Sequence, residues 1–214
     1  MRSIKLVLSA LMLCSSGAML VACQPAQAPD TAARTGPVTP REDVVPLVRP
    51  LSLTAMDEPL IVEFELPPPG PNSNTTLTLG LRVFGADDAA SAAVARTVTE
   101  SDLQAELKLV RLGVGNEAPI LLTRREYRGH DASQIVPVGV DGRVPQVVLT
   151  SIDTTAVEQA GIPIRASSSR TLAFAWAPDV APGTYRLELK LIAPDPELAS
   201  IESELLLAYQ HRSK

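Results

Sequence analysis

The sequence contains few of the residues that carry cross-links or covalent chemistry. Its 214 residues include two cysteines and two histidines. This count excludes a cysteine-rich disulfide scaffold, and it disfavours a zinc site, which needs clustered His and Cys. Aromatic residues make up 3% of the chain, so a module that stacks sugars or bases on exposed rings is also disfavoured. We therefore expect an aliphatic core, which a chain of this length can build without disulfides.

Basic residues are also scarce relative to acidic ones, with 19 Lys and Arg against 24 Asp and Glu. Nucleic-acid binding needs a basic surface, and attraction to anionic headgroups needs clustered Lys and Arg, so neither is expected. The chain has no glycine-rich phosphate loop and no G-x-S-x-G motif. The sequence therefore predicts no cofactor, no metal and no nucleic-acid partner.

The N-terminus has the three parts of a secretory signal. Met1–Lys5 carries positive charge, Leu6–Leu13 is apolar, and small residues follow. The whole apolar run, 6–22, has 17 residues, which is near the lower limit for spanning about 30 Å of hydrocarbon, so a retained transmembrane helix stays as an alternative. Removal of residues 1–22 takes away Arg2 and Lys5, which leaves 17 basic and 24 acidic residues and a formal net charge of −7.

Leu20-Val21-Ala22-Cys23 closes this signal and resembles the lipobox of bacterial lipoproteins. The resemblance implies that the Cys23 sulfur receives a diacylglyceryl group and that the mature chain begins there, anchored by several acyl chains. Cys14 is a poorer match because bulky Leu13 precedes it. Asp after the cysteine favours inner-membrane retention in that family, so Gln24 implies an outer-membrane anchor facing the periplasm.

Residues 24–46 are rich in proline and small polar residues and have no apolar periodicity. Such a segment cannot bury a core, and in an extended proline-rich form it reaches about 70 Å. A spacer is the preferred interpretation, and an unselected leader is the alternative. The predicted organisation is a signal peptide over 1–22, a lipidated cysteine and linker over 23–46, and a folded domain over 47–214.

The folded domain shows an apolar period of two, which predicts strands. About eight strands are expected, at Leu60–Leu66, Leu77–Phe84, Leu103–Leu112, Ile120–Tyr127, Gln146–Ile152, Leu172–Trp176, Tyr185–Leu191 and Ile201–Tyr209. A short helix or an ordered loop is expected within Ala86–Arg96. One or two helical turns are expected between a capping box at Thr155 and Glu158 and a stop at Gly161. Residues 129–143 are expected to be irregular. The predicted fold is mainly β, an antiparallel immunoglobulin-like β-sandwich.

Two resemblances support this fold. Asp179-x-x-Pro-Gly-x-Tyr185 resembles the E–F corner of immunoglobulin-like domains, which implies that the Tyr185 hydroxyl is tied to the backbone. The wider pattern resembles small proteobacterial lipoproteins of uncharacterised function. The matching features are the lipobox, the strand around Phe64, Gly161–Ile164, Pro182–Tyr185 and the strand after Pro196–Leu198. This resemblance implies a fold and a location, and no activity.

Candidate catalytic and metal-binding residues are few. His130, Asp131 and one of Ser167–Ser169 could form a hydrolase triad, but a solvent-exposed loop histidine is the preferred interpretation. Asp87 and Asp88 could bind calcium, although helix capping explains them better. His211 lies three residues from the C-terminus. We predict that the protein is not an enzyme.

Two segments are candidates for partner binding. Arg124, Arg125, Tyr127 and Arg128 have a composition common in recognition surfaces, and a solvated strand end is the alternative. Ile135–Val140 is apolar and irregular; packing over the sandwich edge is preferred to a docking surface.

Together these features predict a lipid-anchored, periplasm-facing lipoprotein whose domain binds an envelope or secreted protein. Three alternatives stay open. They are an immunity lipoprotein that neutralises an envelope-directed toxin, a structural spacer and an envelope hydrolase.

Overall fold

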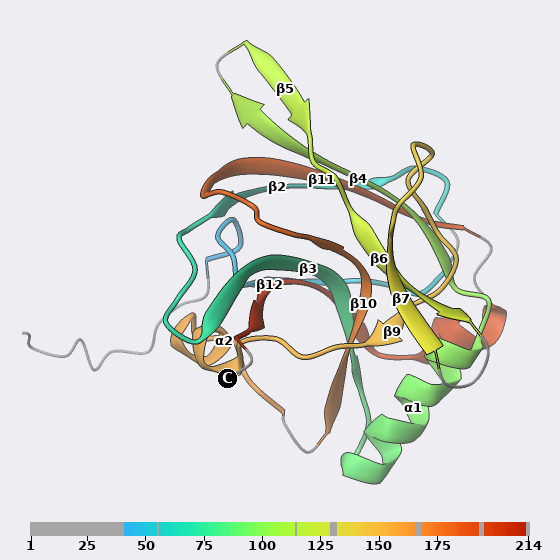
Figure 1. Cartoon of the computed structure of the whole chain (residues 1–214). Helices are drawn as coiled ribbons and strands as arrows, with labels where there is room; N and C mark the ends of the chain where they lie inside the picture. Colours follow the sequence, from blue (N-terminus) through green and yellow to red (C-terminus); the bar gives the residue numbers. More distant parts are fainter. Residues whose placement is uncertain are drawn as a thin grey trace, which may run out of the picture. The chain divides into compact units, whose positions relative to one another are not determined.

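The computed structural model describes residues 41–54, 56–113, 115–128, 132–165, 168–192 and 195–212. In these residues the chain forms two antiparallel sheets (Figure 1). The prediction of a mainly β, two-sheet sandwich is therefore confirmed. The signal segment, Cys23 and most of the predicted linker lie outside the described residues.

The larger sheet has the order β1-β12-β3-β10-β6-β7, with β9 beside β10. Its strands are β1 Leu47–Pro50, β12 Ser203–His211, β3 Ser73–Phe84, β10 Ser169–Ala177, β6 Thr123–Arg128, β7 Ala132–Pro137 and β9 Val148–Leu149. The smaller sheet has the order β2-β11-β4-β5, with β8 beside β4. Its strands are β2 Leu60–Leu66, β11 Gly183–Ile192, β4 Gln104–Gly113, β5 Asn116–Pro119 and β8 Arg143–Val144.

The core lies between the two sheets and is mostly aliphatic, as the low aromatic content predicts. Alternate residues of the long strands point inward; Leu187, Leu189 and Leu191 of β11 are buried, for example. The Phe64 and Tyr185 rings stack in this core with their centroids 5.8 Å apart. Their contact joins the neighbouring strands β2 and β11.

The β10–β11 connection carries the chain from one sheet to the other. Within it the Tyr185 hydroxyl donates to the Ala181 carbonyl at 2.5 Å, and the Asp179 carboxylate accepts from the Thr75 hydroxyl at 2.8 Å. The backbone tie that the sequence implied for Tyr185 is confirmed. It fixes the angle at which β11 enters the smaller sheet.

Two helices lie outside the sheets. Asp87 caps α1 (Asp88–Glu100) by accepting from the Ala90 N–H at 2.8 Å, which confirms capping at this position. The second helix, α2 (Thr154–Gln159), was predicted to start from Thr155, and this is wrong. Asp153 caps it instead, accepting from the Ala156 N–H at 3.2 Å. A 3-10 helix follows at Pro196–Ser200.

The structure departs from the predicted elements where strands are short. Twelve strands occur in the described residues instead of about eight. Residues 129–143, expected to be irregular, contain β7, which pairs with β6 along its length. The run Gln146–Ile152 yields only β9, two residues long. Strands this short show too few residues for alternation to be seen.

Residues before the predicted start of the folded domain, Leu47, also pack against that domain. Val45 is buried in the core, and its N–H donates to the Glu65 carbonyl at 2.9 Å. Arg41–Pro46 therefore belongs to the folded domain.

Candidate functional site: an apolar groove beside β4

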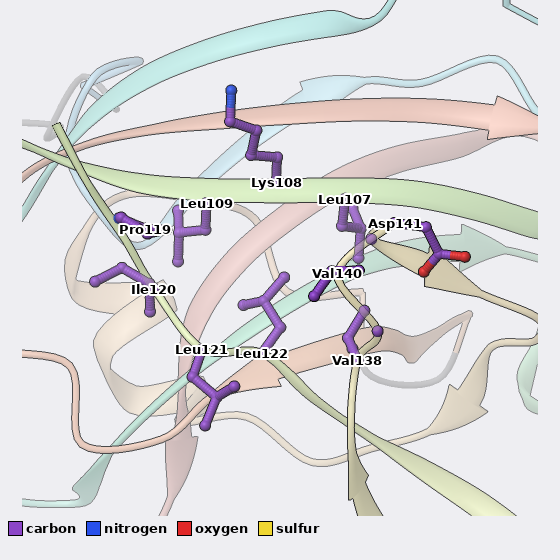
Figure 2. A pocket seen from close by; sticks show the side chains of 12 residues that line it. Leu107, Lys108, Leu109, Pro119, Ile120, Leu121, Leu122, Val138, Val140 and Asp141 are labelled. Atoms are coloured by element: carbon purple, nitrogen blue, oxygen red, sulfur yellow. The ribbon is translucent and has the colours of Figure 1, made fainter.

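A groove of about 420 Å³ lies along the outer edge of β4. Its walls are β4 itself, Pro119 at the end of β5 with the linker from β5 to β6 (Ile120–Leu122), and the linker from β7 to β8 (Val138–Gly142). In Figure 2, Leu107 and Leu109 point from β4 into the groove, and Lys108 points the opposite way. A concave, mostly apolar site of this volume is typical of ligand pockets.

The groove exists because β4 is only partly paired on this edge. On the side away from β11, β5 pairs with Val110–Gly113 and β8 pairs with Ala105 and Glu106. Leu107–Leu109 therefore have no strand partner on that side in the described part of the chain. Across this gap the Leu107 N–H donates to the Gly142 carbonyl at 3.0 Å, and the Leu109 carbonyl accepts from the Ile120 N–H at 2.9 Å.

The linker Val138–Gly142 can come within hydrogen-bonding distance of β4 because residue 142 is a glycine. Gly142 has a positive φ of 71°, a conformation that residues with a side chain rarely adopt. A Cβ at this position would lie within 2.4 Å of the Leu107 carbonyl oxygen. The Gly142 N–H donates to the Gly139 carbonyl at 2.9 Å, and the turn that this bond closes forms one end of the groove.

Large apolar side chains at the mouth of the groove are exposed to solvent. Leu121 is 65% exposed and Val140 is fully exposed, whereas Leu109 and Leu122 at the base are buried. Exposed apolar side chains next to a concave apolar surface mark an interaction site more often than scattered single residues do.

The charged residues at the rim are already engaged within the domain. Lys108 donates to the Glu188 carboxylate at 3.3 Å. The Asp141 carboxylate accepts from the Arg143 N–H at 3.2 Å. Asp141 has no ion-pair partner among the described residues, so the groove offers a ligand apolar contact and backbone groups with one negative charge at its rim.

The four residues predicted as a binding cluster lie on β6 but do not form one surface. Alternation places Arg124 and Arg125 on opposite faces of the strand. Arg124 pairs with Glu126 at 3.2 Å, and the Arg125 guanidinium lies over the Trp176 ring, 5.9 Å from its centroid. Tyr127 is exposed. Arg128 ends the strand, and its side chain is outside the described residues.

Four of the other candidate residues lie outside the described ranges, namely Cys23, His130, Asp131 and Ser167. Ser169 begins β10 and donates its hydroxyl to the Arg165 carbonyl at 2.9 Å. Asp88 pairs with Arg170 at 2.7 Å in the first turn of α1. No group of three or more His, Cys, Asp or Glu able to hold a metal occurs among the residues that the structure describes. Over the same ranges, no helix is both long and apolar enough to cross a bilayer.

The Ile135–Val140 segment was expected to pack over the sandwich edge, and this is true only in part. Val138 packs against the core, but Ile135 and Val140 are exposed. The groove itself was not predicted. Its only signal in the sequence is that Leu121 and Val140 are large apolar residues in linkers, where polar residues are usual.

The fold and the groove define the class of the domain, a two-sheet antiparallel β-sandwich with a tyrosine corner and an apolar edge groove. Comparisons with protein-family models, curated proteins and solved structures find no match. The lipoprotein resemblance therefore stays a prediction.

Proposed function

We propose that this chain is a lipid-anchored binding protein of the bacterial envelope and not an enzyme. Its sandwich binds an extended segment of a protein partner in the groove beside β4. The observation that carries this proposal is the interrupted edge of β4, where Leu107–Leu109 face an apolar groove instead of a strand.

An extended segment fits this site better than a helix or a compact small molecule. The gap is three residues long, or about 10 Å of strand, and it is bounded at both ends by backbone that already pairs with β4. The Leu107 N–H and the Leu109 carbonyl are already bonded to the two linkers, so a peptide that enters the gap meets the remaining main-chain groups of this edge and apolar side chains at alternate positions. Recognition by strand addition uses both kinds of contact.

The anchor rests on the lipobox at Leu20–Cys23. The described domain begins at Arg41, 18 residues after Cys23. A proline-rich segment of that length reaches up to about 55 Å when extended. We propose that it lets the groove meet partners away from the outer membrane, on its periplasmic side.

Peptide selection on the purified full chain tests the binding proposal. Selected peptides are expected to carry apolar residues at alternate positions. Leu121→Asp and Val140→Asp should each weaken their binding at least tenfold, because a charge at the mouth of an apolar groove is desolvated when a peptide binds. Ile61→Asp is the matched control, since Ile61 is an exposed apolar residue of β2 in the same sheet. Equal loss in all three variants, or in none, contradicts the proposal.

Labelling with palmitate tests the anchor separately. The wild type should incorporate the label and Cys23→Ser should not, while Cys14→Ser should label like the wild type. If the wild type stays unlabelled and native material still begins at Met1, the anchor proposal is wrong. The groove could still bind a partner in that case, so the two proposals fail independently.

A further inference from the structure

A second hollow of about 420 Å³ lies over Trp176, on a different part of the molecule from the groove. Trp176 packs with Val148 and Ala173 in a small cluster separate from the main core. Arg125 from β6 and Gln210 and His211 from β12 also line the hollow. Three strands and the β9–α2 linker thus bring polar groups together on one face of the larger sheet.

The charge in this hollow has only one sign. Its lining residues include Arg125 and no Asp or Glu. Eight arginines in the described ranges pair with a carboxylate, namely Arg41, Arg49, Arg82, Arg124, Arg143, Arg165, Arg170 and Arg186. Arg125 has no such partner among those residues and contacts the Trp176 ring instead. Arg96, Arg111 and Arg212 also have no carboxylate partner in those ranges, so Arg125 is distinguished by its position beside Trp176 in a hollow that no acid lines.

Hydrogen-bond donors around the hollow outnumber the acceptors that they meet. The buried indole Nε1 of Trp176 has no hydrogen-bond partner in the described part of the chain. The Asn74 side-chain amide donates to the Gln210 oxygen at 3.5 Å, and the Gln210 amide nitrogen has no acceptor among those residues. The Trp176 Nε1 is closed to solvent, so a ligand in the hollow meets the Arg125 guanidinium and the polar side chains of the walls.

We propose that this hollow binds an oxyanion, a phosphate or carboxylate group of a small solute. Arginine recognises such groups with a planar fork of N–H donors, and bonds to a charged acceptor are stronger than neutral ones. The Gln210 amide, the Ser151 hydroxyl and the His211 ring add donors from the opposite wall. Trp176 holds the guanidinium in place by a cation–π contact.

The chain has a single tryptophan, so its one indole N–H resonance reports directly on this hollow. The test titrates the purified full chain with inorganic phosphate, and in a second arm with acetate, at an ionic strength held constant with chloride. A saturable shift of the indole resonance is expected in at least one arm, and the arm that saturates identifies the group. The absence of a saturable shift in both arms would overturn the proposal.

Two neighbouring arginines provide the matched variants. Arg125→Gln should lower the affinity for the saturating anion at least tenfold. Arg124→Gln should bind this anion like the wild type, because Arg124 points to the other face of β6. His211→Gln provides a second variant in case Arg125→Gln fails to fold, and it should weaken binding about threefold. Unchanged affinity in a folded Arg125→Gln protein, or in His211→Gln where the first variant is unfolded, would also overturn the proposal.

Discussion

At the scale of single residues, the Tyr185 hydroxyl is a clear determinant of the fold, because its bond to the Ala181 carbonyl fixes the corner between the sheets. Tyr185→Phe keeps the buried ring and removes only this bond. We expect the free energy of unfolding to fall by about 1–1.5 kcal/mol, measured by urea denaturation. Tyr127→Phe is the control, because Tyr127 is exposed. An equal loss in both variants would show that the corner bond has no special role.

A second residue-scale prediction concerns Gly80 in β3. A Cβ at this position would lie 2.2 Å from the Leu172 carbonyl oxygen of β10, next to the register shift in that strand. Gly80→Ala should therefore cost about 3 kcal/mol or prevent folding, since backbone must move to make room. Gly70→Ala meets only ordinary contacts at 3.6 and 3.9 Å, so its unfolding free energy should change by less than about 0.5 kcal/mol. Thermal unfolding of both variants measures the difference.

At the scale of elements, the start of α1 depends on one carboxylate. The Asp87 side chain accepts from the Ala90 N–H, which otherwise has no partner at a helix N-terminus. Asp87→Ala should lower the unfolding free energy by about 1 kcal/mol, and Asp87→Asn should retain most of the stability. Amide hydrogen exchange should locate the loss in the first turn of α1. Exchange that increases evenly over the whole domain would contradict this interpretation.

The elements also show how far the sequence predicts the structure. The strands β2, β4 and β11 were expected because each has several apolar residues in alternation, and β10 and β12 were expected from mostly apolar runs. The Asp87 cap and the Tyr185 corner have signatures that depend on a few neighbouring residues. The strands β5, β7, β8 and β9 have two to six residues. These short strands form because they pair with neighbouring strands. The sequence within each of them is too short to predict that pairing.

The groove could not be predicted for a related reason. Leu121 lies next to β4 because the short strand β5 pairs with β4 and brings the chain back along it. Val140 lies there because Gly142 allows its linker to approach β4 closely. These contacts depend on the order of strands in both sheets, which single-strand periodicity does not determine. Partner binding by Arg124, Arg125, Tyr127 and Arg128 stays a prediction. Alternation along β6 places Arg124 and Arg125, which are adjacent in sequence, on opposite faces of the strand.

At the scale of the whole molecule, Tyr209 links the two sheets. It lies in β12 of the larger sheet, and its hydroxyl donates at 2.8 Å to the carbonyl of Pro67, the residue after β2 of the smaller one. Burial, with a smaller contribution from Tyr185, raises the pKa of Tyr209 to about 12. The unfolded chain releases this proton near pH 10. The stability due to the neutral phenol is therefore complete below pH 10 and is lost as the pH rises towards 12.

We accordingly expect the unfolding free energy to fall by about 2 kcal/mol between pH 10 and pH 12 from this residue. Urea denaturation at a series of alkaline pH values measures the loss. Tyr209→Phe should be about 1 kcal/mol less stable at neutral pH, because the bond to Pro67 is absent, but it should lose less stability at high pH. A variant that follows the wild-type pH curve throughout would show that another group controls the alkaline transition.

The outermost strands have a property that matters when many copies crowd together. Three of the four outermost strands end in a proline, with Pro50 in β1, Pro137 in β7 and Pro119 in β5. The fourth, β2, is bordered by the chain itself, because the Val45 N–H donates to the Glu65 carbonyl and the Glu65 N–H donates to the Asp43 carbonyl. Proline cannot donate to an added strand, and a covered edge offers no template to a second copy. Concentrated solutions should thus resist fibril formation.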